Sequence, residues 1–157
     1  MRRSLFLALS SLTVWADAHI FVYHRFDDNL HASTNTSIET LRSQFEYLRT
    51  NGYKVVPLQT IHHALTNNIP VSDKWVSFNI DDSYKSFYTN ALPLFKEYGY
   101  PFTLFVYVEA TDKHYGDFMT WDQIRDTQQY GEIGLHSYGH YHSVSLDKES
   151  IEEETQN

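Results

Sequence analysis

Short apolar runs alternate with helical segments along this chain, and the alternation restricts the fold more than any other feature of the sequence. Five runs are rich in β-branched and aromatic residues and are bounded by turn residues. They occupy residues 19–23, 53–56, 75–80, 102–108 and 132–135. The pattern predicts an α/β fold in which βα units with right-handed crossovers form a parallel sheet.

Helical segments fill the intervals between these runs. Thr36 and Glu39 have the spacing of a capping box ahead of an apolar helical face that ends near Gly52. Further helices are expected over residues 58–67, 84–98 and 120–130. Pro93 must kink or interrupt its helix, because proline has no N–H to donate.

Length and charge exclude several classes of protein. The chain has 157 residues, a length typical of one domain. Its formal net charge of −8 repels the phosphates of nucleic acid, so no nucleic-acid partner is expected. It has no cysteine, which excludes disulfides, thiolate nucleophiles and cysteine-ligated zinc. Any metal ion must therefore be held by carboxylates and by some of the nine histidines.

Residues 1–18 have the features of a secretory signal peptide. A basic start precedes an apolar run, and Ala16 and Ala18 provide a small-residue cleavage site. The run is too short to span a bilayer, which needs about 20 apolar residues, so no transmembrane segment is expected after cleavage. We expect export to the periplasm or the exterior and a mature domain of residues 19–157. The alternative is that the run forms a buried first strand or helix.

Two acidic residues, Asp81 and Asp82, directly follow the run at residues 75–80. In α/β folds the chemistry lies at the carboxyl ends of the strands, where a turn lets both carboxylates point into one site. Their like charges separate their proton affinities, so that one can bind a cation while the other acts as a base. The alternative is that one of them only caps the following helix.

Two histidines, His136 and His140, leave the last apolar run in a similar way. Imidazoles four residues apart can share one metal ion if the segment curls, which Gly139 favours. Taken alone, they can also be ordinary surface histidines. Together with an aspartate from the other strand end, they supply three ligands for a zinc-like divalent ion and leave a position for water.

A divalent ion held in this way lowers the pKa of bound water toward about 7, and the second aspartate can then accept the proton. The residues therefore predict metal-assisted hydrolysis, without deciding between an amide, an ester and a phosphoester. A phosphoesterase is the least favoured of the three, because the acidic charge of the chain gives little affinity for phosphate.

These segments resemble the polysaccharide deacetylases of carbohydrate esterase family 4. The family's first motif, Thr-Phe-Asp-Asp-Gly at a strand end, is similar to residues 78–84 (FNIDDSY), and its second, His-Ser/Thr-x-x-His, to residues 136–140 (HSYGH). The segments 91–106 and 119–121 are also similar to the family. The early segment 23–28 (YHRFDD) resembles the first strand of exported members that deacetylate N-acetylglucosamine polymers.

The resemblance implies Asp81 as general base and Asp82, His136 and His140 as ligands of a divalent ion, zinc in the first place, with cobalt and nickel as alternatives. It implies a distorted (β/α) barrel of the polysaccharide deacetylase type. It also implies removal of N-acetyl groups from N-acetylglucosamine-containing polysaccharide by attack of metal-activated water. No residue is assigned to binding the substrate.

Two features depart from the family pattern. Ser83 stands where the first motif has glycine, and a serine suits the turn only if its φ stays negative. The family's later motifs, including a Leu-x-His that supplies the general acid, have no counterpart before Asn157. We therefore expect an N-terminal portion of the domain, incomplete at its C-terminus, with no residue assigned as acid. The alternative function is an inactive metal- or glycan-binding remnant.

Overall fold

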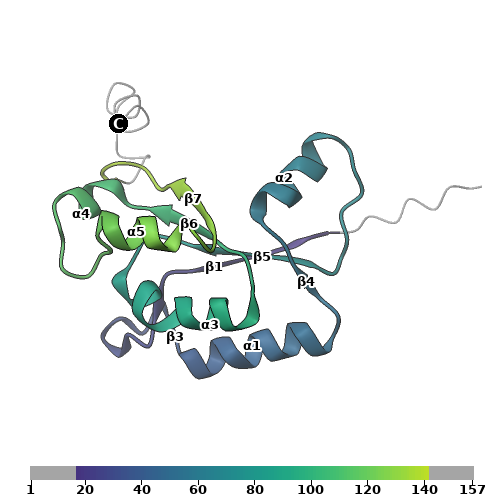
Figure 1. Cartoon of the computed structure of the whole chain (residues 1–157), viewed down its shortest axis with the longest axis horizontal. Coiled ribbons are helices and arrows are strands. Elements are labelled where there is room, and N and C mark those ends of the chain that lie inside the picture. The colour runs from purple at the N-terminus through teal and green to yellow at the C-terminus, as the bar shows by residue number, and fades with distance from the viewer. Residues whose placement is uncertain (1–16, 142–157) are drawn as a thin grey trace, which may run out of the picture.

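The structure is a computed structural model that describes residues 17–141, so all but the last two residues of the expected signal peptide lie outside the described part. The main sheet contains five parallel strands, four of them in the order β1-β5-β6-β7 (Figure 1). These strands are β1 (His19–Tyr23), β4 (Lys54–Val55), β5 (Trp75–Ile80), β6 (Thr103–Val106) and β7 (Glu132–Leu135). A second, two-stranded parallel sheet joins β2 (Arg25–Phe26) to β3 (Asn35–Thr36).

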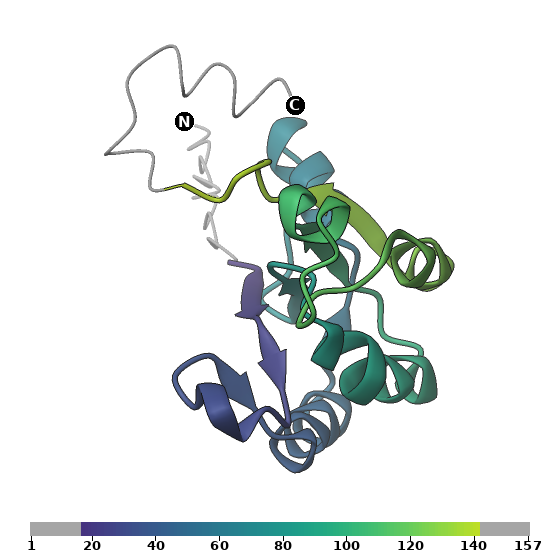
Figure 2. The ribbon, with the colours of Figure 1, turned by 90° about the vertical axis from the view of Figure 1, so that its left-hand side faces the viewer.

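The helices follow the strands along the chain. They are α1 (Ile38–Thr50), α2 (Leu58–Thr66), α3 (Leu92–Tyr98), α4 (Val108–Asp112) and α5 (Trp121–Thr127), with a short 3₁₀ helix η1 (Asn29–His31) and a π-helical turn η2 (Phe87–Ala91). Helices α1, α3 and α5 lie in succession along one side of the sheet (Figure 2).

Strand β5 lies at the centre of the fold. It pairs with β1 over its last five residues, with β4 at its start and with β6 at its end. Tyr23 lies opposite Ile80, and the N–H of Asp81 donates to the Tyr23 carbonyl at 2.8 Å. Because this register is fixed, the residues that follow the two strands, His24 and Asp81, leave the sheet side by side.

Alternation along β5 builds the core. Val76, Phe78 and Ile80 are almost fully buried and face the helices. The Phe78 ring lies 5.2 Å from Phe45 of α1 and 5.5 Å from Phe95 of α3, measured between ring centroids. Burying each such side chain stabilises the fold by roughly 1.5–3 kcal/mol. The residues between them, and Asp81 beyond them, therefore face the other side of the sheet.

The element boundaries differ from the expected ones in two places. The cap of α1 is Ser37, whose hydroxyl accepts from the N–H of Thr40, so the proposed box on Thr36 was wrong by one residue. The helix expected over residues 84–98 divides into η2 and α3, and Pro93 lies at the start of α3. Because Pro93 has no N–H for the preceding turn, the chain widens there into a π-helical turn.

Strand β1 ends the strand order on one side, and its other edge has no ladder partner among residues 17–141. Its middle residues Ile20, Phe21 and Val22 are between 44% and 53% exposed. An apolar strand edge of this kind is as expected for a barrel that the described residues do not close. The predicted parallel α/β architecture is confirmed.

Candidate metal centre

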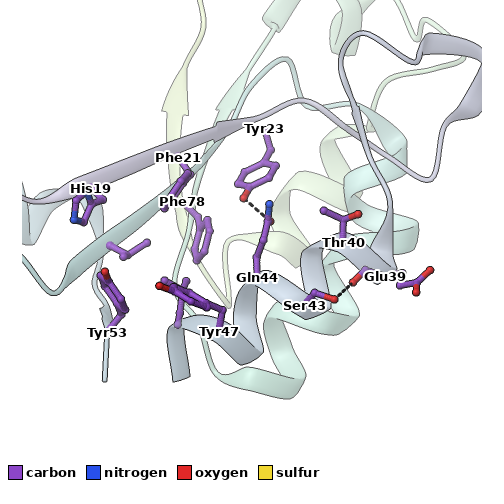
Figure 3. A pocket seen from close by; sticks show the side chains of 12 residues that line it. His19, Phe21, Tyr23, Glu39, Thr40, Ser43, Gln44, Tyr47, Tyr53 and Phe78 are labelled. Carbon is purple, nitrogen blue, oxygen red and sulfur yellow. Dashed lines mark hydrogen bonds between the residues drawn. The ribbon is translucent and has the colours of Figure 1, made fainter. Parts of the chain in front are cut away.

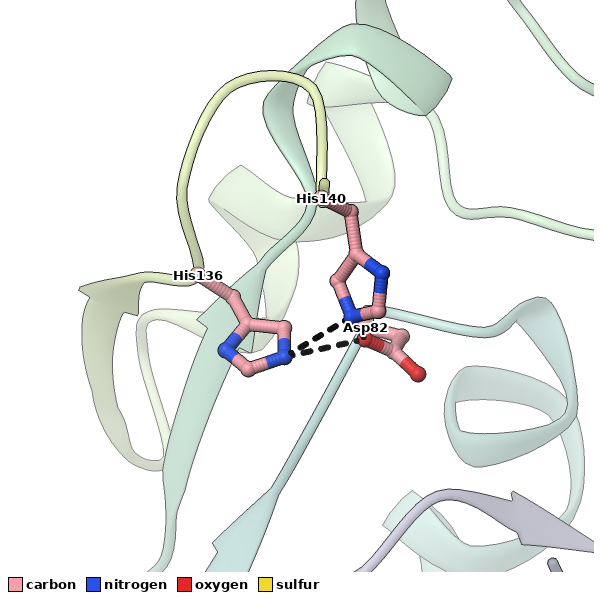
Figure 4. A group of neighbouring side chains, drawn as sticks. All are labelled: Asp82, His136 and His140. Atoms are coloured by element: carbon pink, nitrogen blue, oxygen red, sulfur yellow. Dashed lines mark hydrogen bonds and ion pairs between the residues drawn. The ribbon is translucent and has the colours of Figure 1, made fainter. Parts of the chain in front are cut away.

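Three side chains from two strand ends converge at the carboxyl edge of the sheet (Figure 4). Asp82 follows β5, and His136 and His140 lie on the loop that follows β7. The Oδ1 atom of Asp82 lies 3.2 Å from Nε2 of His136 and 3.1 Å from Nε2 of His140. The two Nε2 atoms are 3.2 Å apart. The structure thus brings together the three residues that the sequence predicts as ligands.

The spacing and chemistry of these atoms fit a divalent ion. A tetrahedral zinc with bonds of about 2.0–2.1 Å separates its ligand atoms by roughly 3.3–3.4 Å, close to the distances found here. Asp82 is only 6% exposed, and its Oδ1 atom accepts no hydrogen bond from the described residues. A buried carboxylate oxygen without a donor is costly unless a cation binds it. One carboxylate and two imidazoles are a ligand set that zinc accepts.

The turn that carries Asp82 is strained. Asp82 and Ser83 both have left-handed backbone angles, with φ of 67° and 55°. The φ of Ser83 is positive, so the condition under which a serine would suit this turn without strain is not met. Each non-glycine residue in this region costs on the order of 1–3 kcal/mol, and such residues gather at functional sites. The Ser83 carbonyl accepts a hydrogen bond from the N–H of Met119 at 2.9 Å, which holds the turn in place.

The loop that carries the histidines is held by its own contacts. Ser137 and His140 also have positive φ, at 60° and 56°. The Ser137 hydroxyl accepts from the N–H of His140 at 3.1 Å. The N–H of Glu109, in the first turn of α4, donates to the Tyr138 carbonyl at 3.0 Å. The Tyr107 ring packs 5.3 Å from the His140 ring, so that the imidazole is fixed from one side.

Asp81 lies beside these three candidate ligands without belonging to their group. Burial raises the pKa of the Asp81 carboxyl, whereas the imidazoles of His136, His24 and His140 act to lower it. A carboxylate with a raised pKa is a better proton acceptor at neutral pH than an exposed one. The geometry therefore suits Asp81 to the role of base, which remains a prediction.

His24 is a site residue that the sequence did not identify. It directly follows β1, and its imidazole is close enough to act on the pKa of Asp81. The segment 23–28 resembles the first strand of exported family members, but the resemblance assigns no role to its histidine. The missing signal was the register of β1 on β5, which places His24 beside Asp81. Of the other histidines, His142 lies outside the described residues.

A groove of about 530 Å³ lies elsewhere, between β1 and α1 (Figure 3). Five of its twelve lining residues are phenylalanine or tyrosine, among them Phe21, Tyr23 and Phe78. Because Phe78 and Asp81 face opposite sides of the sheet, this groove is separate from the metal centre.

Within residues 17–141, no helix is both long enough and apolar enough to cross a membrane.

A parallel sheet with side chains at its carboxyl edge that could hold a metal ion defines the class of protein, an α/β domain with a candidate metal centre. The sequence profile of the family described as "Polysaccharide deacetylase" matches residues 68–157, more than half of the chain, and the protein belongs to this family. The predicted family is thereby confirmed.

Individual relatives agree with this assignment. The poly-beta-1,6-N-acetyl-D-glucosamine N-deacetylase of Escherichia coli (strain K12) is 29% identical over 145 residues, which cover 80% of this chain and 21% of the relative. This chain therefore spans about a fifth of the length of that relative.

Solved structures confirm the fold class, the (β/α) barrel type of the polysaccharide deacetylases. The Streptococcus pyogenes deacetylase PplD in complex with acetate aligns with a TM-score of 0.78 at 22% identity, covering 87% of this chain and 63% of that one. A de-N-acetylase from Aggregatibacter actinomycetemcomitans aligns with a TM-score of 0.70 at 26% identity, covering 84% and 59%.

Proposed function

We propose that the protein is a metal-dependent N-deacetylase of polysaccharide that contains N-acetylglucosamine. The observation that carries this proposal is the convergence of Asp82, His136 and His140 beside Asp81 in a chain of the polysaccharide deacetylase family. The name of the Escherichia coli relative, an N-deacetylase of poly-beta-1,6-N-acetyl-D-glucosamine, supports the substrate class.

Asp82, His136 and His140 would hold the divalent ion. Their ligand atoms favour zinc, and cobalt or nickel can replace it in such a site. When bound, the ion polarises the carbonyl of the acetamido group and lowers the pKa of water toward about 7. The fixed backbone on both sides of the site would keep the three ligands oriented without large rearrangement.

Asp81 and His24 would move the protons. Asp81 accepts the proton of the attacking water as the bond forms between the water oxygen and the amide carbon. His24, beside it, donates a proton to the nitrogen as the carbon–nitrogen bond breaks, which yields acetate and a free amine. Leaving-group protonation of this kind typically contributes about 10²–10⁴-fold in rate. The register of β1 on β5 supports the assignment of His24 as this donor.

Export belongs to the same proposal. We infer that residues 1–18 are a signal peptide and that the mature domain begins at His19. N-terminal sequencing of the protein secreted by a bacterial host tests this, and a mature protein that still begins at Met1 would contradict it.

Acetate release from N-acetylglucosamine oligomers, by the full chain supplied with zinc or cobalt, tests the activity. We expect release that is lost in Asp81→Asn and His136→Ala and retained in His62→Ala, an exposed histidine of α2. Release that survives both site variants would refute the proposal. Metal binding without any release would instead identify an inactive metal-binding module.

A further inference from the structure

Arg25 is a buried charge close to the metal centre. It begins β2, one residue after His24, and is only 7% exposed. Its Nη1 atom lies 2.5 Å from Oδ2 of Asp28, and its Nη2 atom lies 3.5 Å from Oδ2 of Asp117. Burying a guanidinium is costly unless other groups pair with it. The partners of Arg25 on several sides therefore indicate that this residue has a specific structural or functional role.

The guanidinium also stacks on Tyr84. The Arg25 Cζ atom lies 3.7 Å from the centroid of the Tyr84 ring, and the Phe118 ring also packs against Tyr84, at 4.7 Å between centroids. A planar guanidinium held flat on an aromatic face is a contact that lysine cannot reproduce. Arg25 and Phe118 therefore fix the position of the Tyr84 ring.

Tyr84 connects this arrangement to a metal ligand. It stands two residues after Asp82, at the end of the strained turn. The backbone of Tyr84 pairs with that of Phe118 in an isolated antiparallel bridge, so its backbone and its ring anchor the same end of the turn. Because only Ser83 separates the two residues, a shift of Tyr84 would move the backbone that orients the Asp82 carboxylate.

The same turn is attached to the loop that partners Arg25. The N–H of Met119 donates to the Ser83 carbonyl at 2.9 Å, and the N–H of Lys85 donates to the Asp117 carbonyl at 2.7 Å. The ion pair between Arg25 and Asp117 joins β2 to this loop. A turn with two left-handed residues needs such external contacts, since its own backbone disfavours the conformation.

We propose that Arg25 is a positioning residue for the metal centre, which fixes Tyr84 and through it the ligand orientation of Asp82. The inference rests on the proposed function, because it concerns the same site. Outer contacts that orient a metal ligand typically change metal affinity by about 10- to 100-fold when they are lost.

Zinc titration of the full chain against a chromophoric chelator tests this. We expect Arg25→Lys, which keeps the charge but not the stacked plane, and Tyr84→Leu, which removes the stacked ring, each to weaken zinc binding by about 10-fold or more. Arg42→Lys is the matched control, because Arg42 pairs with Glu97 and lies 5.9 Å from the Tyr98 ring, away from the metal centre. It should bind zinc as the wild type does.

A merely structural role of Arg25 would lower the melting temperature of the metal-free chain without changing its zinc affinity. Thermal unfolding of the metal-free variants and the visible absorption spectrum of their cobalt forms separate the two roles. The positioning role predicts an altered cobalt spectrum in Arg25→Lys. If Arg25→Lys does not fold, Tyr84→Leu, which removes the stacking surface, must show the same loss of zinc affinity.

The outcomes separate this inference from the proposed function. A wild-type chain that binds no zinc would refute the proposed function and, with it, the role of Arg25. A wild-type chain whose zinc affinity is matched by a folded Arg25→Lys or by Tyr84→Leu would refute the role of Arg25 alone.

Discussion

The Nε2 atom of His140 lies 3.1 Å from Oδ1 of Asp82, almost the same distance that separates His136 Nε2 from this oxygen. One buried oxygen is thus shared by two imidazoles that reach it from a single loop. Neither imidazole forms a geometrically satisfactory hydrogen bond to it, since Oδ1 is without a donor among the described residues. The arrangement suits a cation that lies between all three side chains.

Loss of a ligand should abolish tight metal binding. In Asp82→Asn the carboxylate charge is removed while the size of the side chain is kept. Residues that only orient a metal ligand cost up to about 100-fold in metal affinity when they are lost. Because Asp82 would bind the ion directly, we expect zinc affinity to fall by at least this factor. Metal content after dialysis measures this, with His62→Ala on the surface of α2 as control. A variant that retains zinc as the wild type does would show that Asp82 is not a ligand.

Zinc should stabilise the folded chain. A ligand at about 100 times its Kd adds roughly 2.7 kcal/mol of stability. In a domain of this size that corresponds to a rise in Tm of about 5–10 °C. Thermal unfolding with zinc, and again after addition of a chelator, measures the shift. The shift should be absent in His136→Ala, and a shift of equal size there would place the zinc elsewhere.

His24 should affect the rate of reaction and leave metal binding intact. Replacing it in His24→Gln removes the proposed proton donor, so we expect kcat to fall by about 10²–10⁴-fold. Zinc affinity should stay within a few-fold of the wild-type value, because His24 is not one of the three ligands. Rates of acetate release and zinc titrations check both parts. A wild-type rate in the variant would remove His24 from the mechanism.

Ser83→Gly should stabilise the chain. A φ of 55° strains a serine, whereas glycine adopts the left-handed region freely. We therefore expect Ser83→Gly to raise the free energy of unfolding by about 1 kcal/mol. The matched change Ser43→Gly, on the exposed side of α1, should lose about 1 kcal/mol. Urea unfolding measures both, and losses of equal size at the two positions would contradict the strain at Ser83.

Tyr23 should make stability depend on alkaline pH. Burial raises the pKa of its phenol to about 12, against about 10 in an unfolded chain. Its contribution is therefore complete below pH 10 and is lost as the pH rises toward 12. The free energy of unfolding of Tyr23→Phe should fall less steeply over this interval. A Tyr23→Phe chain whose stability falls as steeply as that of the wild type over this interval would contradict the prediction.

Much of the fold was predictable because its signals are local. The apolar run at residues 75–80 and the small or polar residues around it specify β5 without reference to the rest of the chain. The division of the helix before Pro93 was foreseen only as a kink, because the form of the interruption depends on how the turn packs. The cap of α1 was misplaced by one residue, since Thr36 is paired with β2 and Ser37 is free to cap.

The site was partly predictable for a related reason. Asp81, Asp82 and the two histidines follow recognisable strands, so the edge they share could be inferred. His24 could not be assigned, because its role depends on which strand β1 pairs with and in what register. Arg25 could not be assigned either, since its contacts with Asp117 and Tyr84 join segments that are far apart in the chain.

The register of β1 on β5 also provides a way to test whether a purified sample is correctly folded. A slip of one residue would exchange the directions of Ile80 and Asp81, placing a carboxylate in the core and an aliphatic chain at the metal centre. A misassembled molecule would therefore lack both the packed interior and the ion. Under the proposed function, zinc stoichiometry measured on a purified preparation would therefore count the fraction of molecules that have reached the correct strand pairing.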